Sequence, residues 1–154
     1  MPHLTTYVGL ADRSEQTLAT SLRAVGEGHA KVADVFHTCQ LLAQMSDRHR
    51  QRLAPVVERY GEDRDIDEPE RLHADGLGQA REGEIGLLRD LQDLHVLASL
   101  VQITWTVIAQ GAQGLRDHEL LEVAQSSNAE TSRQLTWLNT RMKAAAPQAL
   151  IIAP

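Results

Sequence analysis

The 154-residue chain contains a single cysteine, Cys39, and only 3% aromatic residues. One cysteine excludes a disulfide framework within the chain, and it excludes a zinc or iron–sulfur centre built from several cysteines of one chain. The sequence shows no basic segment followed by an apolar run, so we expect no signal peptide. A reducing, cytoplasmic environment is therefore the expected location.

The chain also lacks an excess of positive charge. Its 15 Lys and Arg residues are outnumbered by 21 Asp and Glu, which gives a net charge of −6. Nucleic-acid-binding modules usually carry basic patches, so the net charge argues against this function class and we expect no nucleic-acid partner. The longest apolar-rich stretch, residues 94–109, is interrupted by polar side chains. It is shorter than the roughly 20 apolar residues of a membrane-spanning helix, and we expect no membrane segment.

Apolar residues recur at helical spacing in four segments, which predicts helices at residues 4–29, 31–60, 80–110 and 117–145 of a single domain, 1–154. Between the second and third helices, residues 62–79 are acidic and read as a connection. About 18 extended residues span roughly 60 Å, whereas a helix of about 27 residues is roughly 40 Å long. The predicted fold is therefore an all-α four-helix bundle whose long connection crosses the full length of the bundle.

Polar residues interrupt the apolar stripes at mid-helix. Glu15 interrupts the first stripe and His49 the second. If the first turn is centred near Lys31, equal rise per residue places Glu15 and His49 at the same height. Burial of a carboxylate without a partner costs several kcal/mol. A partner for Glu15, either a side chain or a metal ion, is therefore expected there.

The second pair of helices contains a similar interruption at Glu130. With the second turn centred near Gly114, Glu130 lies level with Ala98, and His95 is then a polar neighbour about one turn away. Glutamate and histidine side chains from facing helices are the usual ligands of metals in bundle cores. The same residues also suit a buried network of hydrogen bonds and ion pairs, and this is the interpretation we favour.

The four helices, the long second connection and the mid-helix glutamate resemble the ferritin-like superfamily of carboxylate-bridged dimetal proteins. That resemblance implies a glutamate on the first and third helices and a Glu-x-x-His motif on the second and fourth. Glu15 matches the first position. The second motif reads S-D-R-H and retains only His49, while the fourth reads E-T-S-R and retains only Glu130. His95 is offered on the third helix where glutamate is expected, and Arg133 replaces the second histidine.

Two functions follow from this resemblance. The first is a non-enzymatic ferritin-like bundle with a structural, stress-related or interaction role, whose metal site has become a buried polar network. The alternative is a metal-binding or oxidase-type protein that holds iron or another divalent metal through Glu15, His49, His95 and Glu130. Arg133 distinguishes them, because its pairing with Glu15 or Glu130 would exclude a metal ion.

The third predicted helix is apolar nearly all round between residues 94 and 108. A bundle buries about one face of each helix, so a second apolar face needs its own cover. The C-terminal residues 149–152 could supply it. Otherwise a second copy does, and we expect a homodimer through this helix.

Two local patterns concern the helix surfaces. The basic run Arg48, Arg50 and Arg52 is followed by acidic residues, which predicts a solvated face. Asp117 precedes the fourth helix and is expected to cap its N-terminus.

Overall fold

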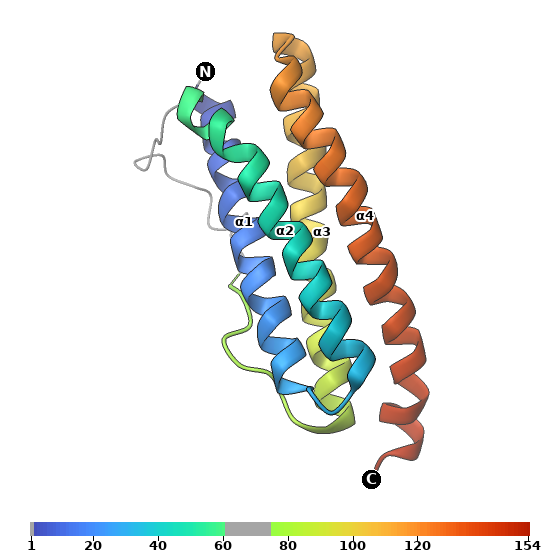
Figure 1. Ribbon diagram of the computed structural model, residues 1–154. Helices are drawn as coiled ribbons and strands as arrows, with labels where there is room; N and C mark the ends of the chain where they lie inside the picture. Colours follow the sequence, from blue (N-terminus) through green and yellow to red (C-terminus); the bar gives the residue numbers. More distant parts are fainter. Residues whose placement is uncertain (1, 61–74) are drawn as a thin grey trace.

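The structure, a computed structural model, describes residues 2–60 and 75–154, and its regular elements over these residues are all helices (Figure 1). Its elements are α1 (Pro2–Gly28), α2 (Ala33–Tyr60), α3 (Gly83–Leu115), α4 (His118–Pro147) and the short π-helix η2 (Gln148–Ile152). The all-α four-helix prediction is confirmed for these residues. The expected limits of the first, second and fourth helices lie within two residues of those observed.

The third helix ends later than predicted. Helix α3 continues through Gly111 and Gly114 to Leu115, and it stops at Arg116, whose backbone is left-handed with φ 57°. A glycine within a helix costs only about 1 kcal/mol, so it does not by itself end one. The Asp117 side chain caps α4 as predicted, by accepting the Leu120 backbone N–H at 3.1 Å.

Contacts at the two ends of the bundle define its topology. At one end, the last residue of α1, Gly28, lies against Ala80, just before α3 begins. At the other end, the Tyr60 hydroxyl of α2 donates to Asp117 Oδ2 at 2.6 Å. Helix α2 therefore ends at the opposite end of the bundle from the start of α3, as Figure 1 shows.

The predicted connection, residues 62–79, falls mostly on residues 61–74, which lie outside the described residues. Its described end, from residue 75 onward, is not helical and lies along α1. The Leu77 backbone N–H donates to Ser21 Oγ at 2.9 Å, and a Cβ on Gly76 would come within 2.6 Å of the same oxygen. A side chain at position 76 would therefore have to displace this contact.

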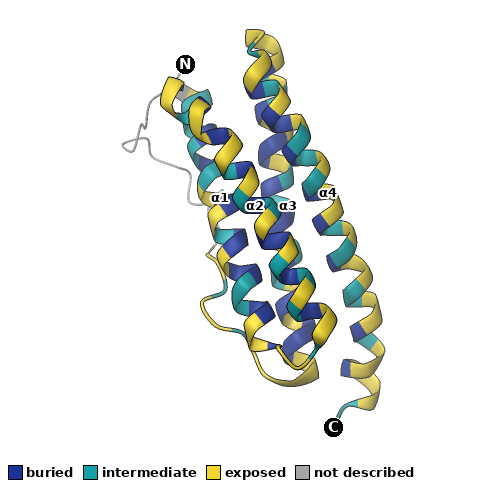
Figure 2. Ribbon diagram, in the orientation of Figure 1, coloured by how far each residue is buried: buried dark blue, intermediate teal, exposed yellow. Residues whose placement is uncertain are grey.

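The predicted apolar stripes face inward and form one core (Figure 2). Burial of a Leu or Ile side chain contributes about 1.5–3 kcal/mol, so this core is the main stabilising term. The closest packing joins α1 to α2 and α3 to α4, whereas α2 and α4 have fewer contacts. Polar contacts line the boundary between α2 and α4: Asp34 pairs with Arg141 at 2.6 Å and Arg59 with Asp117 at 3.1 Å.

Candidate functional site

His49 is the centre of a buried polar network at mid-bundle. Its Nδ1 contacts Glu15 Oε2 of α1, and its Nε2 lies 3.2 Å from Glu130 Oε1 of α4. His49 and Glu15 are both fully buried, and the Glu130 side chain is 17% exposed. The predicted common height of Glu15 and His49 is confirmed by their contact. Three of the four predicted site residues therefore meet in one network.

Further partners extend the network to all four helices. Trp105 of α3 donates its Nε1–H to Glu15 Oε2 at 3.2 Å. On the outer side, Glu130 accepts from Arg48 Nη2 at 3.2 Å and from Arg52 Nη1 at 3.3 Å. The network thus runs from a buried indole, through carboxylate, imidazole and carboxylate, to two half-exposed guanidinium groups.

The geometry indicates the charge of His49. A neutral imidazole has one N–H and one lone pair, so it would place a lone pair against one of the two carboxylates. With both ring nitrogens protonated, His49 donates to Glu15 and to Glu130, and its positive charge lies between two negative ones. Arg48 and Arg52 offset the remaining charge of Glu130 at the surface.

The electrostatics of Glu130 agree with this arrangement. Partial burial by itself would raise the pKa of Glu130, but the hydrogen bond from Arg48 and the charge of His49 outweigh it. The pKa of Glu130 therefore lies below its ordinary value of 4.5. The carboxylate remains ionised at neutral pH and can hold its three partners.

These residues do not fit the dimetal centre that the resemblance implies. The two ring nitrogens of His49 point in opposite directions, so a single ion bound to one of them reaches one carboxylate and not the other. Arg48 and Arg52 both contact the Glu130 carboxylate, which in a dimetal centre would bridge the metal ions. No group of three or more His, Cys, Asp or Glu side chains in the described part of the chain is placed to hold a metal ion.

His95 lies outside the network, and its nearest polar partner is Ser99, whose hydroxyl is 3.4 Å from His95 Nδ1. The expected register between α3 and α4 was wrong. Asn128 contacts Thr106 at 3.3 Å and Ser132 contacts Gln102 at 3.0 Å, so Glu130 lies level with residue 104 rather than 98.

The cause of this register error is the longer third helix. Because α3 continues to Leu115, the turn to α4 lies about three residues beyond Gly114. Counting from the wrong turn displaced the expected neighbour of Glu130 by about six residues, or roughly 9 Å along the helix.

Pairing of Arg133 with Glu15 or Glu130 was expected to distinguish the two functions, but two other arginines pair with Glu130 instead. Arg133 is exposed, and none of the ion pairs found among the described residues joins it to Glu15 or Glu130. Arg48 and Arg52 take that role, so their prediction as a merely solvated face was incomplete. Arg50, the third member of the basic run, pairs with Asp12 of α1 at 3.0 Å.

Trp105 lies within the apolar stretch of the third predicted helix, and nothing in such a stretch distinguishes an indole that donates a hydrogen bond from one that is simply packed. A second network was also not predicted. The fully buried Asp90 of α3 lies 2.8 Å from His29 Nε2, and its two oxygens also accept from the Arg81 side chain at 2.8 Å and backbone N–H at 2.9 Å. Asp90 is three residues after Leu87 and four before Leu94, so it interrupts a core stripe as Glu15 does. That pattern was the available signal.

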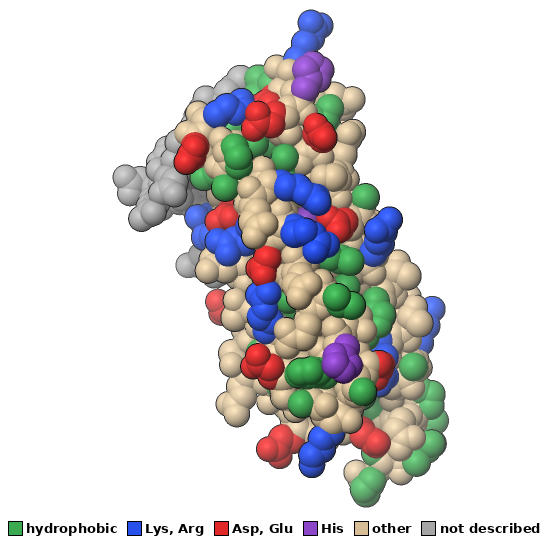
Figure 3. Space-filling model, viewed as in Figure 1, with side chains coloured by type: hydrophobic (Ala, Val, Ile, Leu, Met, Phe, Trp, Pro, Cys, Tyr) green, Lys and Arg blue, Asp and Glu red, His purple; other side chains and the backbone are tan. Residues whose placement is uncertain are grey.

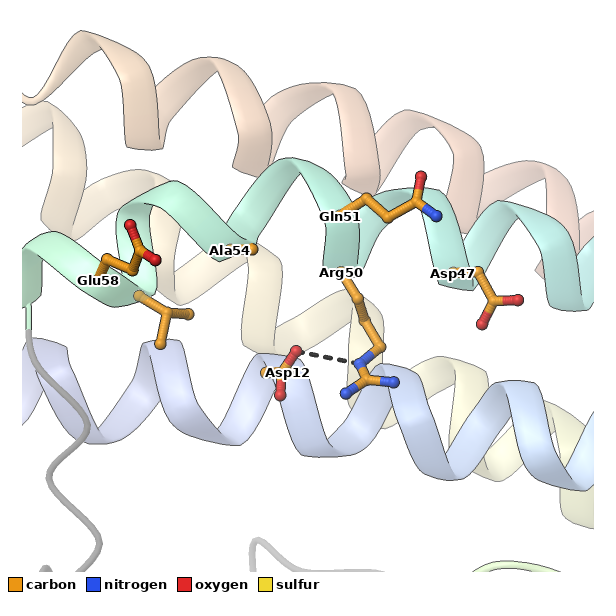
Figure 4. A pocket seen from close by; sticks show the side chains of 7 residues that line it. Asp12, Asp47, Arg50, Gln51, Ala54 and Glu58 are labelled. Carbon is orange, nitrogen blue, oxygen red and sulfur yellow. Dashed lines mark hydrogen bonds and ion pairs between the residues drawn. The ribbon is translucent and has the colours of Figure 1, made fainter.

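A groove on the outer surface between α1 and α2 offers no comparable chemistry (Figure 4). Asp12 of α1 and Arg50 of α2 reach toward each other across it, and Arg23 pairs with Asp47. Its charged side chains are thus largely paired with one another.

The single cysteine does not offer a nucleophile either. Burial raises the pKa of the Cys39 thiol to about 12, so Cys39 is a poor nucleophile.

Comparisons of the chain with protein-family models, with curated proteins and with solved structures found no match.

Proposed function

We propose that this protein is a non-enzymatic helical bundle with a structural or interaction role, in which the mid-bundle network joins the four helices. One observation carries this proposal: both ring nitrogens of His49 are engaged by carboxylates, Glu15 on one side and Glu130 on the other. A histidine that acts as a general base or metal ligand needs a free lone pair. His49 in this arrangement has none.

Access to the network supports the same proposal. Glu15 and His49 are fully buried, so a substrate would have to displace the helices to reach them. Only Glu130 is partly exposed, and its oxygens contact Arg48 and Arg52. A buried charged network of this kind favours one helix register over others, because any shift would leave a charge without its partner.

The resemblance to the ferritin-like superfamily bears on the ancestry of this network. The chain retains Glu15, His49 and Glu130 at three of the expected ligand positions, and α2 and α3 begin at the same end of the bundle. We infer that an ancestral metal site has degenerated into the present network. The single buried cysteine fits a reducing, cytoplasmic location.

A second candidate is a metal-binding or oxidase-type protein with a reduced ligand set. It is favoured by a specific observation: Glu15 Oε1 is buried and has no hydrogen-bond partner. A metal ion there would require His49 to lose its proton and to give up one of its two carboxylates.

Metal content separates the two candidates. Untagged protein purified without chelator is analysed by elemental mass spectrometry, then titrated with Fe(II), Mn(II) and Zn(II). We expect far less than one metal ion per chain, with no difference between the wild type and a His49→Ala/Glu130→Ala variant. Near-stoichiometric metal in the wild type that is lost in this variant would overturn the proposal and justify oxidase assays.

A further inference from the structure

Charge is balanced at the two ends of the boundary between α2 and α4 but not in its middle. Asp34 pairs with Arg141 at one end, and Asp117 pairs with Arg59 at the other. In the middle, two arginines of α2 share a single carboxylate of α4. Figure 3, which looks onto α2 and α4, shows basic side chains gathered near mid-height. This part of the surface is therefore positive, although the whole chain has a net charge of −6.

Arg133 adds a third positive charge to these two arginines. It lies three residues after Glu130 on α4, a spacing that places both side chains on the same side of the helix. The hydrogen bond from Gln134 to Ser46 Oγ, at 3.1 Å, sets this turn of α4 level with the part of α2 just before Arg48. Arg133 is exposed and has no ion pair with any described residue. Its long side chain can therefore reach the region of the two other arginines.

Few carboxylates are available to neutralise these arginines. Glu130 is the single acidic residue within positions 123–154. The acidic residue next to the cluster on α2, Asp47, pairs with Arg23 of α1 instead. The imidazolium behind the cluster is already balanced by the buried carboxylate of α1. Three arginines against one carboxylate thus leave a surplus of two positive charges.

The guanidinium groups also keep most of their hydrogen-bond donors free. Arg48 and Arg52 each contact Glu130 through one nitrogen, at 3.2 Å and 3.3 Å. These distances exceed the roughly 2.7–2.9 Å of a strong charge-assisted hydrogen bond. A guanidinium has five N–H donors, and the two side chains are 46% and 43% exposed. Most N–H groups of the cluster can therefore donate to the oxygens of an anion.

We propose that Arg48, Arg52 and Arg133 form a binding site for the phosphate monoester group of a small soluble molecule. Such a group carries a charge of about −1.5 to −2 at pH 7 and three acceptor oxygens, which matches the surplus charge and the three guanidinium groups. Arginine suits this recognition because its planar fork donates two parallel hydrogen bonds to a phosphate. A carboxylate ligand, with one charge and two oxygens, would neutralise only half of the surplus.

A lipid headgroup is another source of a phosphate group. Among the described residues, α3 is the one helix long and apolar enough to cross a membrane by length and composition, but a buried helix of a soluble protein meets the same criteria. The three arginines lie on α2 and α4, and an acidic chain is repelled by an anionic lipid surface. These observations favour a soluble phosphate.

Isothermal titration calorimetry with inorganic phosphate and with methyl phosphate tests the proposal. The buffer contains EDTA, so that no metal ion can bridge the protein and the phosphate. One anion per chain is expected to bind, with a Kd of about 1 mM or tighter. Substitution of any one of the three arginines by glutamine, as in Arg48→Gln, should weaken binding by about tenfold, because it removes a charge together with its hydrogen bonds to the anion.

Two further variants distinguish a defined site from a general attraction of anions. Arg50→Gln is the matched control, because Arg50 belongs to the same basic run but pairs with Asp12 of α1. It should leave the Kd within about twofold of the wild-type value. Glu130→Gln removes the carboxylate that competes for the arginines and should tighten binding by about threefold or more. Circular dichroism should show the same helix content in all variants.

Three results would overturn the proposal. The first is no saturable binding of either phosphate at ten times the expected Kd. The second is equal weakening by Arg50→Gln and Arg48→Gln. The third is binding to vesicles of phosphatidylcholine and phosphatidic acid without binding of soluble phosphate, which would assign the site to a lipid headgroup. Because EDTA removes free metal ions from the titration, this result and the metal result are independent.

Discussion

Two buried histidines among the described residues contact similar partners in different surroundings. His49 lies at mid-bundle, fully buried, between carboxylates of α1 and α4. His29 lies in the turn after α1, 7% exposed, and contacts Asp90 of α3. Each histidine thus joins helices through a carboxylate that also binds arginine. The mid-bundle network, however, depends on helix residues alone, while the other requires Arg81 from the segment before α3.

This difference indicates how well each network can replace a lost hydrogen-bond or ion-pair partner. Arg81 is 41% exposed and also pairs with Asp93 at 2.8 Å, so water and a second carboxylate can replace a lost partner. The fully buried His49 and Trp105 have no such substitute on the Glu15 side. Removal of the buried carboxylate is therefore expected to destabilise the protein more in the network of His49 than in that of His29.

The largest expected effect is that of Glu15→Ala. Removal of this carboxylate leaves the imidazolium of His49 and the indole N–H of Trp105 without their shared partner, and we expect a loss of about 3–5 kcal/mol in the free energy of unfolding. Asp90→Ala should cost less, about 1–3 kcal/mol, because Arg81 can be solvated. Urea denaturation followed by circular dichroism measures both.

Glu15→Gln is the control for the loss of side-chain volume. Its amide oxygen can still accept one hydrogen bond, so its cost should fall between that of the wild type and that of Glu15→Ala. An Asp90→Ala cost equal to or above that of Glu15→Ala would refute the ranking of the two networks by burial.

A smaller effect is expected in acid, on the exposed side of the mid-bundle network. Because the pKa of Glu130 in the folded state is lowered below 4.5, its contribution to stability is complete above that pH and disappears as the pH falls through the lowered value. With Arg48 and Arg52 nearly half exposed, we expect about 1 kcal/mol.

Glu130→Gln tests this assignment, since it removes the titrating group and keeps the side chain's shape. The stability of this variant should fall less steeply than that of the wild type between pH 5 and pH 3. Parallel profiles for the two proteins would show that Glu130 does not carry this part of the acid sensitivity.

Much of the fold was predictable, because helical spacing and turn residues are local signals. The limits of α1, α2 and α4 were expected to within two residues, and the height of Glu15 relative to His49 followed from the first turn. The end of α3 was not predictable from Gly111 and Gly114. Helix α3 stays packed beyond these glycines, with Ala112 buried, and it stops at Arg116, whose backbone is left-handed. Such packing overrides glycine's weak preference.

The candidate site was predictable in part for the same reason. Glu15, His49 and Glu130 interrupt apolar stripes, and interruption is visible in a sequence. The inclusion of His95 was an error of register, inherited from the misplaced second turn. The reach of Arg48 and Arg52 to Glu130 depends on long side chains that cross between helices, and spacing along one helix carries no such information.

In the proposed arrangement, His49 uses both ring nitrogens as donors, one to Glu15 and one to Glu130. Long-range ¹H–¹⁵N spectra of protein labelled at its seven histidines test it most directly, with the signal of His49 assigned by its loss in His49→Gln. We expect both nitrogens of His49 to carry protons in the folded protein, because each of them faces a carboxylate. A nitrogen without a proton would contradict it, because that lone pair could serve a metal ion or a general base.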